Sequence, residues 1–192
     1  MKTHILIITA LESELKQADV PAEVKVIYTG IGKINAALAS VKAIHEYQPK
    51  RIVNFGTVGK INPELSGLIS IGKVIQRDMV AEPLAPRGMT PFCPNPYEYF
   101  SPDGEFICGT GDSFVTTEDP WLGIQKVDVV DMELFAIAAT AFRYNIPWQS
   151  FKYITDDADS GAGNEWQGKM HQGHDLYMKK LNELLWTPKD LG

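Results

Sequence analysis

The sequences VDME (Val130–Glu133) and ITDDAD (Ile154–Asp159) reveal most about the architecture of this chain. In each of them, acidic residues begin where an apolar run with the composition of a buried strand gives way to another structure. In an open α/β sheet, ligands bind in the crevice outside the carboxyl ends of the strands. The two stretches therefore predict an α/β sheet with a ligand site at an acidic carboxyl edge.

Strand-like and helix-like segments alternate along the rest of the chain, which favours a largely parallel sheet covered by helices. We expect a single α/β domain over residues 1–192, with a mixed central β-sheet flanked by helices. Strands are expected at residues 4–9, 24–28, 51–55, 72–77, 105–108, 127–130 and 148–154, and helices at 12–17, 34–47, 132–144 and 176–186.

The helix expected at 34–47 carries a regular apolar stripe. Its members follow the i, i+3, i+4, i+7 spacing of one helix face, which predicts that this face packs on the core. They are Ile34, Ala37, Leu38, Val41 and Ile44.

Two segments are expected to be irregular. Residues 56–59 (GTVG) follow the strand at 51–55, and their glycines predict a turn that lets the backbone approach a ligand closely. Residues 79–99 carry five prolines, which remove backbone donors and predict a loop that could serve as a lid. These prolines are Pro83, Pro86, Pro91, Pro94 and Pro96.

Composition narrows the class of ligand. The 192 residues are 44% hydrophobic and 22% charged, with a net charge of -6 and no clustered stripe of Lys and Arg, so nucleic acid is not expected as a partner. No apolar run is long enough for a membrane helix, and the first residues are expected to form a strand and not a signal peptide. Cys93 and Cys108 lack metal-ligand spacing and are expected to be reduced in the cytoplasm. A small-molecule ligand fits best.

Six short motifs follow one another along nearly the whole chain. Together they resemble the nucleoside phosphorylase and nucleosidase superfamily, and within it most closely the 5'-methylthioadenosine/S-adenosylhomocysteine nucleosidases. The resemblance implies a nucleoside phosphorylase-like fold, a purine nucleoside substrate, a homodimer and no cofactor. The motifs are ALESE (Ala10–Glu14), TGIGK (Thr29–Lys33), NFGTVG (Asn54–Gly59), GDSF (Gly111–Phe114), DME (Asp131–Glu133) and ITDDAD (Ile154–Asp159).

Asp156 is the first candidate catalytic residue. Cleavage of an N-glycosidic bond leaves negative charge on the departing purine, and a carboxylic acid beside a ring nitrogen can neutralise it, which is worth about a hundredfold to ten-thousandfold in rate. The resemblance implies that Asp156 protonates the purine N7 and that Thr155 orients its carboxyl group. From composition alone, these residues would be a solvated acidic loop.

Glu133 and Met132 are candidate ribose contacts. A carboxylate can accept hydrogen bonds from both the 2' and the 3' hydroxyl, and this grip strengthens as the sugar approaches an oxocarbenium ion. The resemblance implies this role for Glu133 and packing of Met132 against the sugar. The alternative is that Asp131 and Glu133 are acids in a first helical turn, favoured by the helix dipole.

Glu12 and Glu14 compete for the role of activating water. Two positions on a helix differ by about 200 degrees, so only one of the two side chains can face the site. The resemblance favours Glu14, although Ser13 interrupts the acids that are common in this motif.

The purine is expected to contact the segment that follows residue 110. The resemblance implies that Phe114 stacks on the base beside Val115, whereas a core Phe in a strand would give the same sequence pattern. Gly56 and Thr57, in the expected turn, are further candidate substrate contacts.

Hydrolysis is expected instead of phosphorolysis. Phosphate binding favours arginine forks, and bacterial phosphorylases of this superfamily have an Arg where this chain has Asn54. The arginines of this chain, Arg51, Arg77, Arg87 and Arg143, fall outside the motif positions. Phosphorolysis and non-catalytic nucleoside binding remain alternatives. The stretch 79–106 is shorter than is typical, which leaves the preference for the 5' substituent open.

Neither a metal nor a dinucleotide cofactor is expected. His171 and His174 lie three residues apart beside Asp175, but no third ligand is evident. Gly30-Ile31-Gly32 lacks the third glycine of a dinucleotide fingerprint, because position 35 is Asn.

Overall fold

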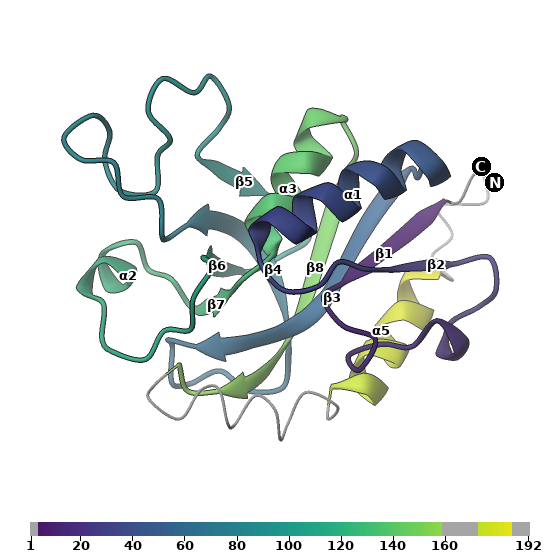
Figure 1. Cartoon of the computed structure of the whole chain (residues 1–192). Coiled ribbons are helices and arrows are strands. Elements are labelled where there is room, and N and C mark those ends of the chain that lie inside the picture. The colour runs from purple at the N-terminus through teal and green to yellow at the C-terminus, as the bar shows by residue number, and fades with distance from the viewer. Residues whose placement is uncertain (1–3, 159–172, 186–192) are drawn as a thin grey trace.

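The computed structural model describes residues 4–158 and 173–185, and its centre is a mixed β-sheet with eight strands (Figure 1). The strands are β1 (Ile5–Thr9), β2 (Lys25–Tyr28), β3 (Arg51–Lys60), β4 (Leu68–Gln76), β5 (Glu98–Phe100), β6 (Phe106–Thr110), β7 (Val129–Asp131) and β8 (Trp148–Asp156). The helices are α1 (Lys33–Tyr47), α2 (Pro120–Ile124), α3 (Leu134–Arg143) and α5 (His174–Leu185), with a 3₁₀ turn, η1, at Gln17–Asp19.

The strands pair in a circuit. The order is β2-β1-β3-β7-β6-β4-β5, and β8 pairs with both β3 and β4, so β3, β7, β6, β4 and β8 close on one another. β1 runs parallel to β2 and β3, and β8 runs parallel to β3, whereas β4 is antiparallel to β5 and β8. The expected mixed sheet flanked by helices is confirmed.

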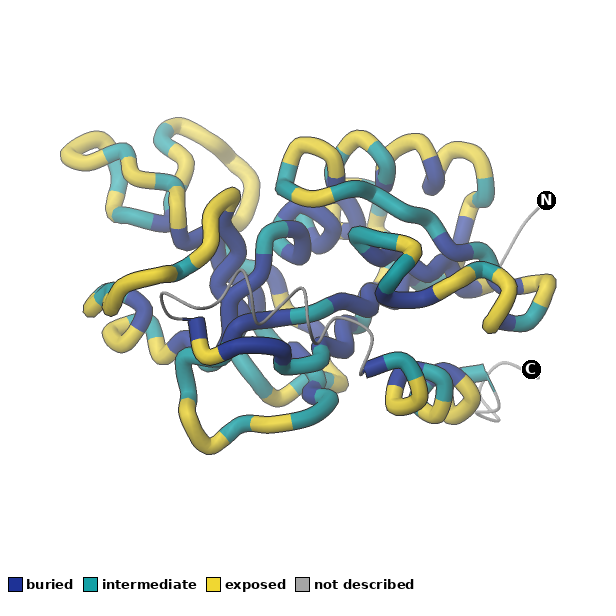
Figure 2. Tube along the Cα trace, turned by 60° about the horizontal axis from the view of Figure 1, so that its bottom comes forward, coloured by how far each residue is buried: buried dark blue, intermediate teal, exposed yellow. Residues whose placement is uncertain are grey.

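Helices cover both faces of the sheet. In β1, Leu6 and Ile8 pack in the cluster that holds α1 and α3, whereas Ile5 and Ile7 pack in the cluster that holds α5. This alternation is the two-residue period of a strand buried on both faces. Figure 2 shows the buried strands at the centre and exposed residues on the outer faces of the helices and the projecting loops.

Helix α1 is confirmed, but the prediction of its buried face is wrong. Ile34 is 72% exposed and Leu38 67% exposed, and only Ile44 of the expected stripe belongs to the core. A second stripe with the same spacing is buried instead, namely Ala36, Ser40, Ala43 and Ile44. Small residues let α1 approach the alanine-rich α3 closely, and spacing alone cannot distinguish this stripe from the larger apolar one.

Two local predictions are also wrong. Residues 12–17 do not form a helix, because the Glu14 carboxylate accepts the backbone N–H groups of Ala10 and Leu11 and so stabilises a turn. Residues 56–59 are not a turn but the last part of β3. Their partners lie on β8, where Gly56 pairs with Lys152, and a bulge follows between Val58 and Gly59.

The proline-rich segment before β5 is irregular, as expected, and projects beside α2 (Figure 1). Helix α2 was not expected, although its start has a clear signal: Pro120 follows Asp119, whose carboxylate caps the backbone N–H of Trp121 at 3.1 Å. None of the helices in the described ranges is long and apolar enough to cross a membrane.

Candidate active site

A cavity lies at the carboxyl ends of β1, β3, β7 and β8, where the sequence predicted a site. It collects residues that are far apart in the sequence, and no residue of the described proline-rich segment 79–97 lines it. The predicted site residues that line it are Glu14, Thr57, Phe114, Val115, Met132, Glu133 and Asp156. Ala10, Ile31, Arg77, Ser113 and Asp131 also line the cavity, without having been predicted to do so.

Glu14 is 2% exposed, and its carboxylate is held by five donors. Oε2 accepts hydrogen bonds from Thr9 Oγ1 at 2.8 Å and from the backbone N–H groups of Ala10 and Leu11 at 3.1 Å each. Oε1 accepts from the Thr57 N–H at 3.1 Å and from Thr57 Oγ1 at 3.0 Å. This carboxylate therefore has a fixed orientation at the junction of β1 and β3, while Glu12 is exposed.

Glu133 reaches the cavity from the segment between β7 and α3. Its Oε1 accepts a hydrogen bond from the Gly32 N–H at 2.8 Å, which joins the GIGK motif to this carboxylate. Burial, and after it the negative charge of Asp131, raise the pKa of Glu133 to about 7, and Lys152 limits the rise. A carboxyl group with this pKa changes its charge in the neutral range.

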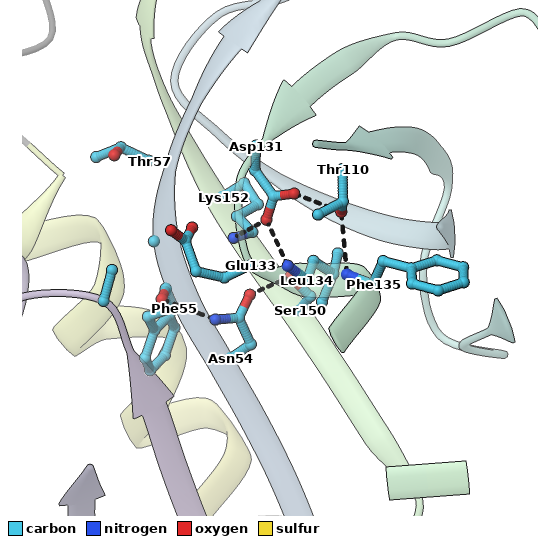
Figure 3. A network of polar contacts seen from close by, with 12 residues as sticks. Asn54, Phe55, Thr57, Thr110, Asp131, Glu133, Leu134, Phe135, Ser150 and Lys152 are labelled. Atoms are coloured by element: carbon cyan, nitrogen blue, oxygen red, sulfur yellow. Dashed lines mark hydrogen bonds and ion pairs between the residues drawn. The ribbon is translucent and has the colours of Figure 1, made fainter. Parts of the chain in front are cut away.

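Asp131 and Lys152 form a buried ion pair beside Glu133 (Figure 3). Lys152 Nζ lies 2.8 Å from Asp131 Oδ2, which also accepts the Leu134 N–H at 2.9 Å, while Asp131 Oδ1 accepts Thr110 Oγ1 at 2.6 Å. Burial opposes ionisation of Asp131, but Lys152 and these hydrogen bonds hold its pKa below the usual value. Asp131 thus caps α3, in agreement with the alternative that places an acid at the start of this helix. It also neutralises Lys152, a role that the sequence did not predict.

Asp156 is the last residue of β8 and is 6% exposed. Its Oδ1 accepts the Ala158 N–H at 2.9 Å, and its Oδ2 accepts Thr155 Oγ1 at 3.0 Å. A Cβ on Gly59 would lie 2.5 Å from Asp156 Oδ1, so only glycine leaves room for the carboxylate in this position.

Phe114 and Val115 lie in the segment after β6. Phe114 is 47% exposed and lines the cavity, so it is not a core residue of a strand. An exposed aromatic ring at the edge of a cavity offers a flat apolar surface to a planar ligand.

Two predicted substrate contacts, Gly56 and Thr155, do not line the cavity. Thr155 is buried and donates to Val58 O at 3.3 Å as well as to Asp156. The Gly56 carbonyl accepts a hydrogen bond from the Tyr177 hydroxyl on α5. A Cβ at position 56 would lie 3.0 Å from Lys152 Nζ, so this glycine makes room for the lysine and not for a ligand.

Asn54 also lies beneath the cavity wall and not in it. Its Nδ2 donates to Ile8 O at 2.9 Å and to Phe55 O at 3.0 Å, and its Oδ1 accepts Ser150 Oγ at 2.8 Å. The side chain therefore connects β1, β3 and β8 (Figure 3). Asn54 therefore holds together the strands that carry the site, but its own side chain does not face the cavity.

The described residues contain no group of three or more His, Cys, Asp or Glu side chains that could hold a metal ion. His174 contacts Asp19 on η1, with Nε2 3.0 Å from Oδ2, and His171 lies outside the described residues. Cys93 is exposed and Cys108 is buried, and both are free thiols.

The closed mixed sheet and the acidic cavity at its carboxyl edge define the class of this protein. Residues 22–187 match the family model of the Phosphorylase superfamily, and the chain belongs to this superfamily. The resemblance found in the six motifs is thereby confirmed.

Particular relatives narrow the comparison. The 5'-methylthioadenosine/S-adenosylhomocysteine nucleosidase of Staphylococcus saprophyticus is 28% identical, with 73% of this chain and 72% of that protein covered. The Helicobacter pylori enzyme of the same name, solved with butyl-thio-DADMe-Immucillin-A, has a TM-score of 0.86 at 17% identity, covering 96% of this chain and 98% of that chain. Futalosine hydrolase of Helicobacter pylori has a TM-score of 0.85 at 17% identity, covering 95% and 97%. These structures establish the nucleoside phosphorylase-like fold.

Proposed function

We propose that this chain is a purine nucleosidase, which hydrolyses the N-glycosidic bond of a purine nucleoside and releases the free base. The observation that carries the proposal is the convergence of Glu14, Glu133 and Asp156 in one cavity beside Phe114. These carboxylates come from three separate parts of the chain, and each of them has a distinct set of hydrogen-bond partners. The names of the relatives point to the same chemistry.

Asp156 and Phe114 bind and activate the base. Phe114 stacks on the purine, with Val115 beside it, and Asp156 donates a proton to the ring nitrogen that takes up the negative charge of the leaving base. Thr155 supports the acid, because its hydroxyl fixes Asp156 Oδ2 at 3.0 Å. A positioned proton donor lowers the barrier in a way that solvent water cannot, since it is already in place in the transition state.

Glu133 and Met132 hold the ribose. The Gly32 N–H fixes Glu133 Oε1, so that the carboxylate can accept the sugar hydroxyls in one orientation. Ionised Glu133 stabilises positive charge on the sugar, and this interaction strengthens as the glycosidic bond breaks. Met132 gives the sugar an apolar contact.

Glu14 orients the attacking water. Its five hydrogen bonds leave the carboxylate no freedom to rotate, and Thr57 supplies two of them from β3. A fixed acceptor of this kind aligns one lone pair of the water with the sugar carbon.

Water suits this site better than phosphate does. Glu14 and ionised Glu133 line the cavity, and a phosphate dianion would meet their negative charge. The nearby cations already have partners, since Lys152 binds Asp131 and Arg77 binds backbone carbonyls. The site therefore favours hydrolysis over phosphorolysis.

A substrate panel with and without inorganic phosphate tests the proposal. It contains 5'-methylthioadenosine, S-adenosylhomocysteine, adenosine, inosine, guanosine and futalosine, and chromatography measures the free base and the sugar product. We expect phosphate-independent base release with a free sugar. Strict dependence on phosphate with a sugar 1-phosphate product would establish phosphorolysis, and binding without base release over hours would establish a nucleoside-binding protein.

We further propose that the enzyme is a cytoplasmic homodimer. The exposed face of α1 presents Ile34 and Leu38, Phe142 on α3 is 49% exposed, and an apolar groove lies between these helices. Exposed apolar side chains beside an apolar groove favour association. Ile31, which precedes α1, is exposed and lines the cavity, and we propose that a second copy docked beside α1 completes the site around the 5' substituent. Leu38→Glu is expected to give monomers in light scattering; a dimer of unchanged stability would refute this interface.

A further inference from the structure

Arg77 follows β4 directly and reaches the wall of the cavity, although its sequence context did not predict it as a site residue. It is 5% exposed, and burial lowers the pKa of its guanidinium, which the neighbouring acids Asp78 and Asp131 oppose. A buried guanidinium is unfavourable unless its N–H groups are hydrogen-bonded. Its partners therefore indicate what this side chain does.

The hydrogen-bond partners of the Arg77 guanidinium all belong to residues 109–113. Nε donates to Gly109 O at 3.2 Å, Nη2 donates to Gly111 O at 3.0 Å and to Ser113 O, and Nη1 donates to Ser113 Oγ at 3.2 Å. These acceptors are three backbone carbonyls and a hydroxyl, all of them neutral. The guanidinium therefore connects the end of β6 to the turn that immediately precedes Phe114.

The segment is shaped to fit this arginine. A Cβ on Gly111 would lie 2.9 Å from Arg77 Cζ and 3.0 Å from Arg77 Cγ, and one on Gly109 would lie 3.6 Å from Arg77 Cδ. Gly111 thus leaves the space that the arginine side chain occupies, whereas a Cβ at position 109 would make only ordinary van der Waals contact with it. The first glycine of the GDSF motif is explained by this contact.

Arg77 is itself held from the proline-rich segment. Arg87 Nε donates to the Arg77 carbonyl at 2.7 Å, and its two terminal nitrogens bind Asp119 at 3.1 and 2.6 Å. The Arg87 guanidinium also stacks over Trp121, 4.5 Å from the ring centroid. The proline-rich segment is therefore fastened through Arg87 and Arg77 to the segment that carries Phe114.

We propose that Arg77 is a positioning residue that fixes residues 111–115 in the conformation that recognises the nucleobase, and so determines the base preference of the site. This inference rests on the proposed function, because it assigns Phe114 and Val115 to the base. By engaging the Ser113 carbonyl, Arg77 sets the direction of the peptide that leads into Phe114. A lysine could not replace it, since one ammonium cannot reach acceptors spread over residues 109–113 in the planar array of a guanidinium.

Arg77→Lys tests the proposal in steady-state kinetics with adenosine and inosine. We expect KM for the preferred nucleoside to rise about tenfold and kcat to change less than about threefold, because base binding is lost and the carboxylates stay in place. The ratio of kcat/KM between the two nucleosides should move about tenfold toward one. Arg51→Lys is the matched control, because Arg51 begins β3 and the cavity lies at the other end of this strand. This variant should leave KM and the kcat/KM ratio unchanged.

A second variant keeps the test decisive if Arg77→Lys does not fold. Ser113→Ala removes only the hydroxyl partner of Arg77 from an exposed residue, and we expect KM to rise about threefold with the same direction of change in base preference. Unchanged KM and base preference in the folded variants would overturn the proposal, as would a fall in kcat alone.

A separate readout distinguishes this proposal from the proposed function. The Kd of an adenine C-nucleoside, whose carbon–carbon bond to the sugar cannot be hydrolysed, is measured by calorimetry for the wild type and Arg77→Lys. An approximately tenfold rise in Kd supports the positioning role even if the wild-type protein releases no base. An equal Kd in the two proteins refutes it, whatever the outcome of the substrate panel.

Discussion

Lys152 on β8 and Asp131 on β7 form an ion pair with side chains that are 2% and 0% exposed, and it lies directly beside Glu133. The pair stabilises a lysine in the interior of the sheet, because the two opposite charges compensate each other where no water can solvate them. It also has opposite consequences for the protonation of Asp131 and Glu133. Asp131 stays ionised at the start of α3, whereas the pKa of Glu133 rises into the neutral range.

Lys152→Met is expected to destabilise the protein strongly. Removing one partner of a buried pair leaves the other charge uncompensated, which costs about 3–5 kcal/mol in the free energy of unfolding. Lys180→Met is the control, because the Lys180–Glu183 pair is at the surface and such a pair is worth about 0–1 kcal/mol. Urea unfolding measures both variants, and a loss at position 152 no larger than that at position 180 would contradict the buried-pair interpretation.

Asp156→Asn is expected to lose most turnover on purine nucleosides while binding remains measurable. The amide keeps the shape of the side chain but cannot donate a proton in the same way, so kcat should fall by about a hundredfold to ten-thousandfold. Asp157→Asn is the control. The Asp157 side chain is 59% exposed and pairs with Lys60, so kcat of this variant should stay at the wild-type value. Wild-type turnover in Asp156→Asn would remove this residue from the mechanism.

Part of this site could be predicted because acids directly follow apolar runs that form buried strands, although β8 runs parallel to β3 and β7 runs antiparallel to it. The ends of the apolar runs at 127–130 and 148–154 were visible in the sequence, and Glu133 and Asp156 follow from them. The resemblance favoured Glu14 over Glu12, and the helix assumed for the two residues does not form. Glu14 is nevertheless the buried acid of the two, because a turn brings its carboxylate back to β1 and β3.

Other features depend on partners that are distant in the sequence. The strand at 56–59 exists because β8 pairs with it, and glycine spacing gave no sign of this pairing. The buried stripe of α1 is decided by close packing against α3, and both candidate stripes have helical periodicity. Arg77 became a site residue only when the fold brought residues 109–113 beside it.

Glu133 is expected to make stability depend on pH. Its folded-state pKa of about 7 lies above the ordinary 4.5, so the folded protein binds this proton more tightly than the unfolded chain does. The contribution is fully present below pH 4.5 and is lost as the pH rises through 7, by about 3 kcal/mol in total. In urea unfolding, the free energy of unfolding of Glu133→Gln should therefore decrease less between pH 4.5 and 8 than that of the wild type. Equal pH dependence in the two proteins would show that Glu133 is not the titrating group.

The same pKa of Glu133 predicts the acid limb of the pH–rate profile. In the proposed mechanism only ionised Glu133 accepts both ribose hydroxyls, so kcat/KM in the wild-type enzyme should rise with pH up to about 7. Glu133→Gln should have a low kcat/KM without this limb. An acid limb retained in the variant would assign the titration to another group.

Gly59→Ala is expected to reduce turnover through Asp156. The added methyl carbon would lie 2.5 Å from Asp156 Oδ1 and 3.1 Å from Ala158 Cβ, so the carboxylate must move away from the position that its hydrogen bond to the Ala158 N–H now fixes. A displacement on the order of 1 Å in a catalytic group can cost about a hundredfold in rate, so kcat should fall more than KM rises. Gly123→Ala in α2 is the matched control, because no atom lies within 4 Å of its added carbon, and this variant should keep wild-type kcat. If Gly59→Ala retained full kcat with an intact fold, the position of the Asp156 carboxylate could not be what limits proton transfer to the base.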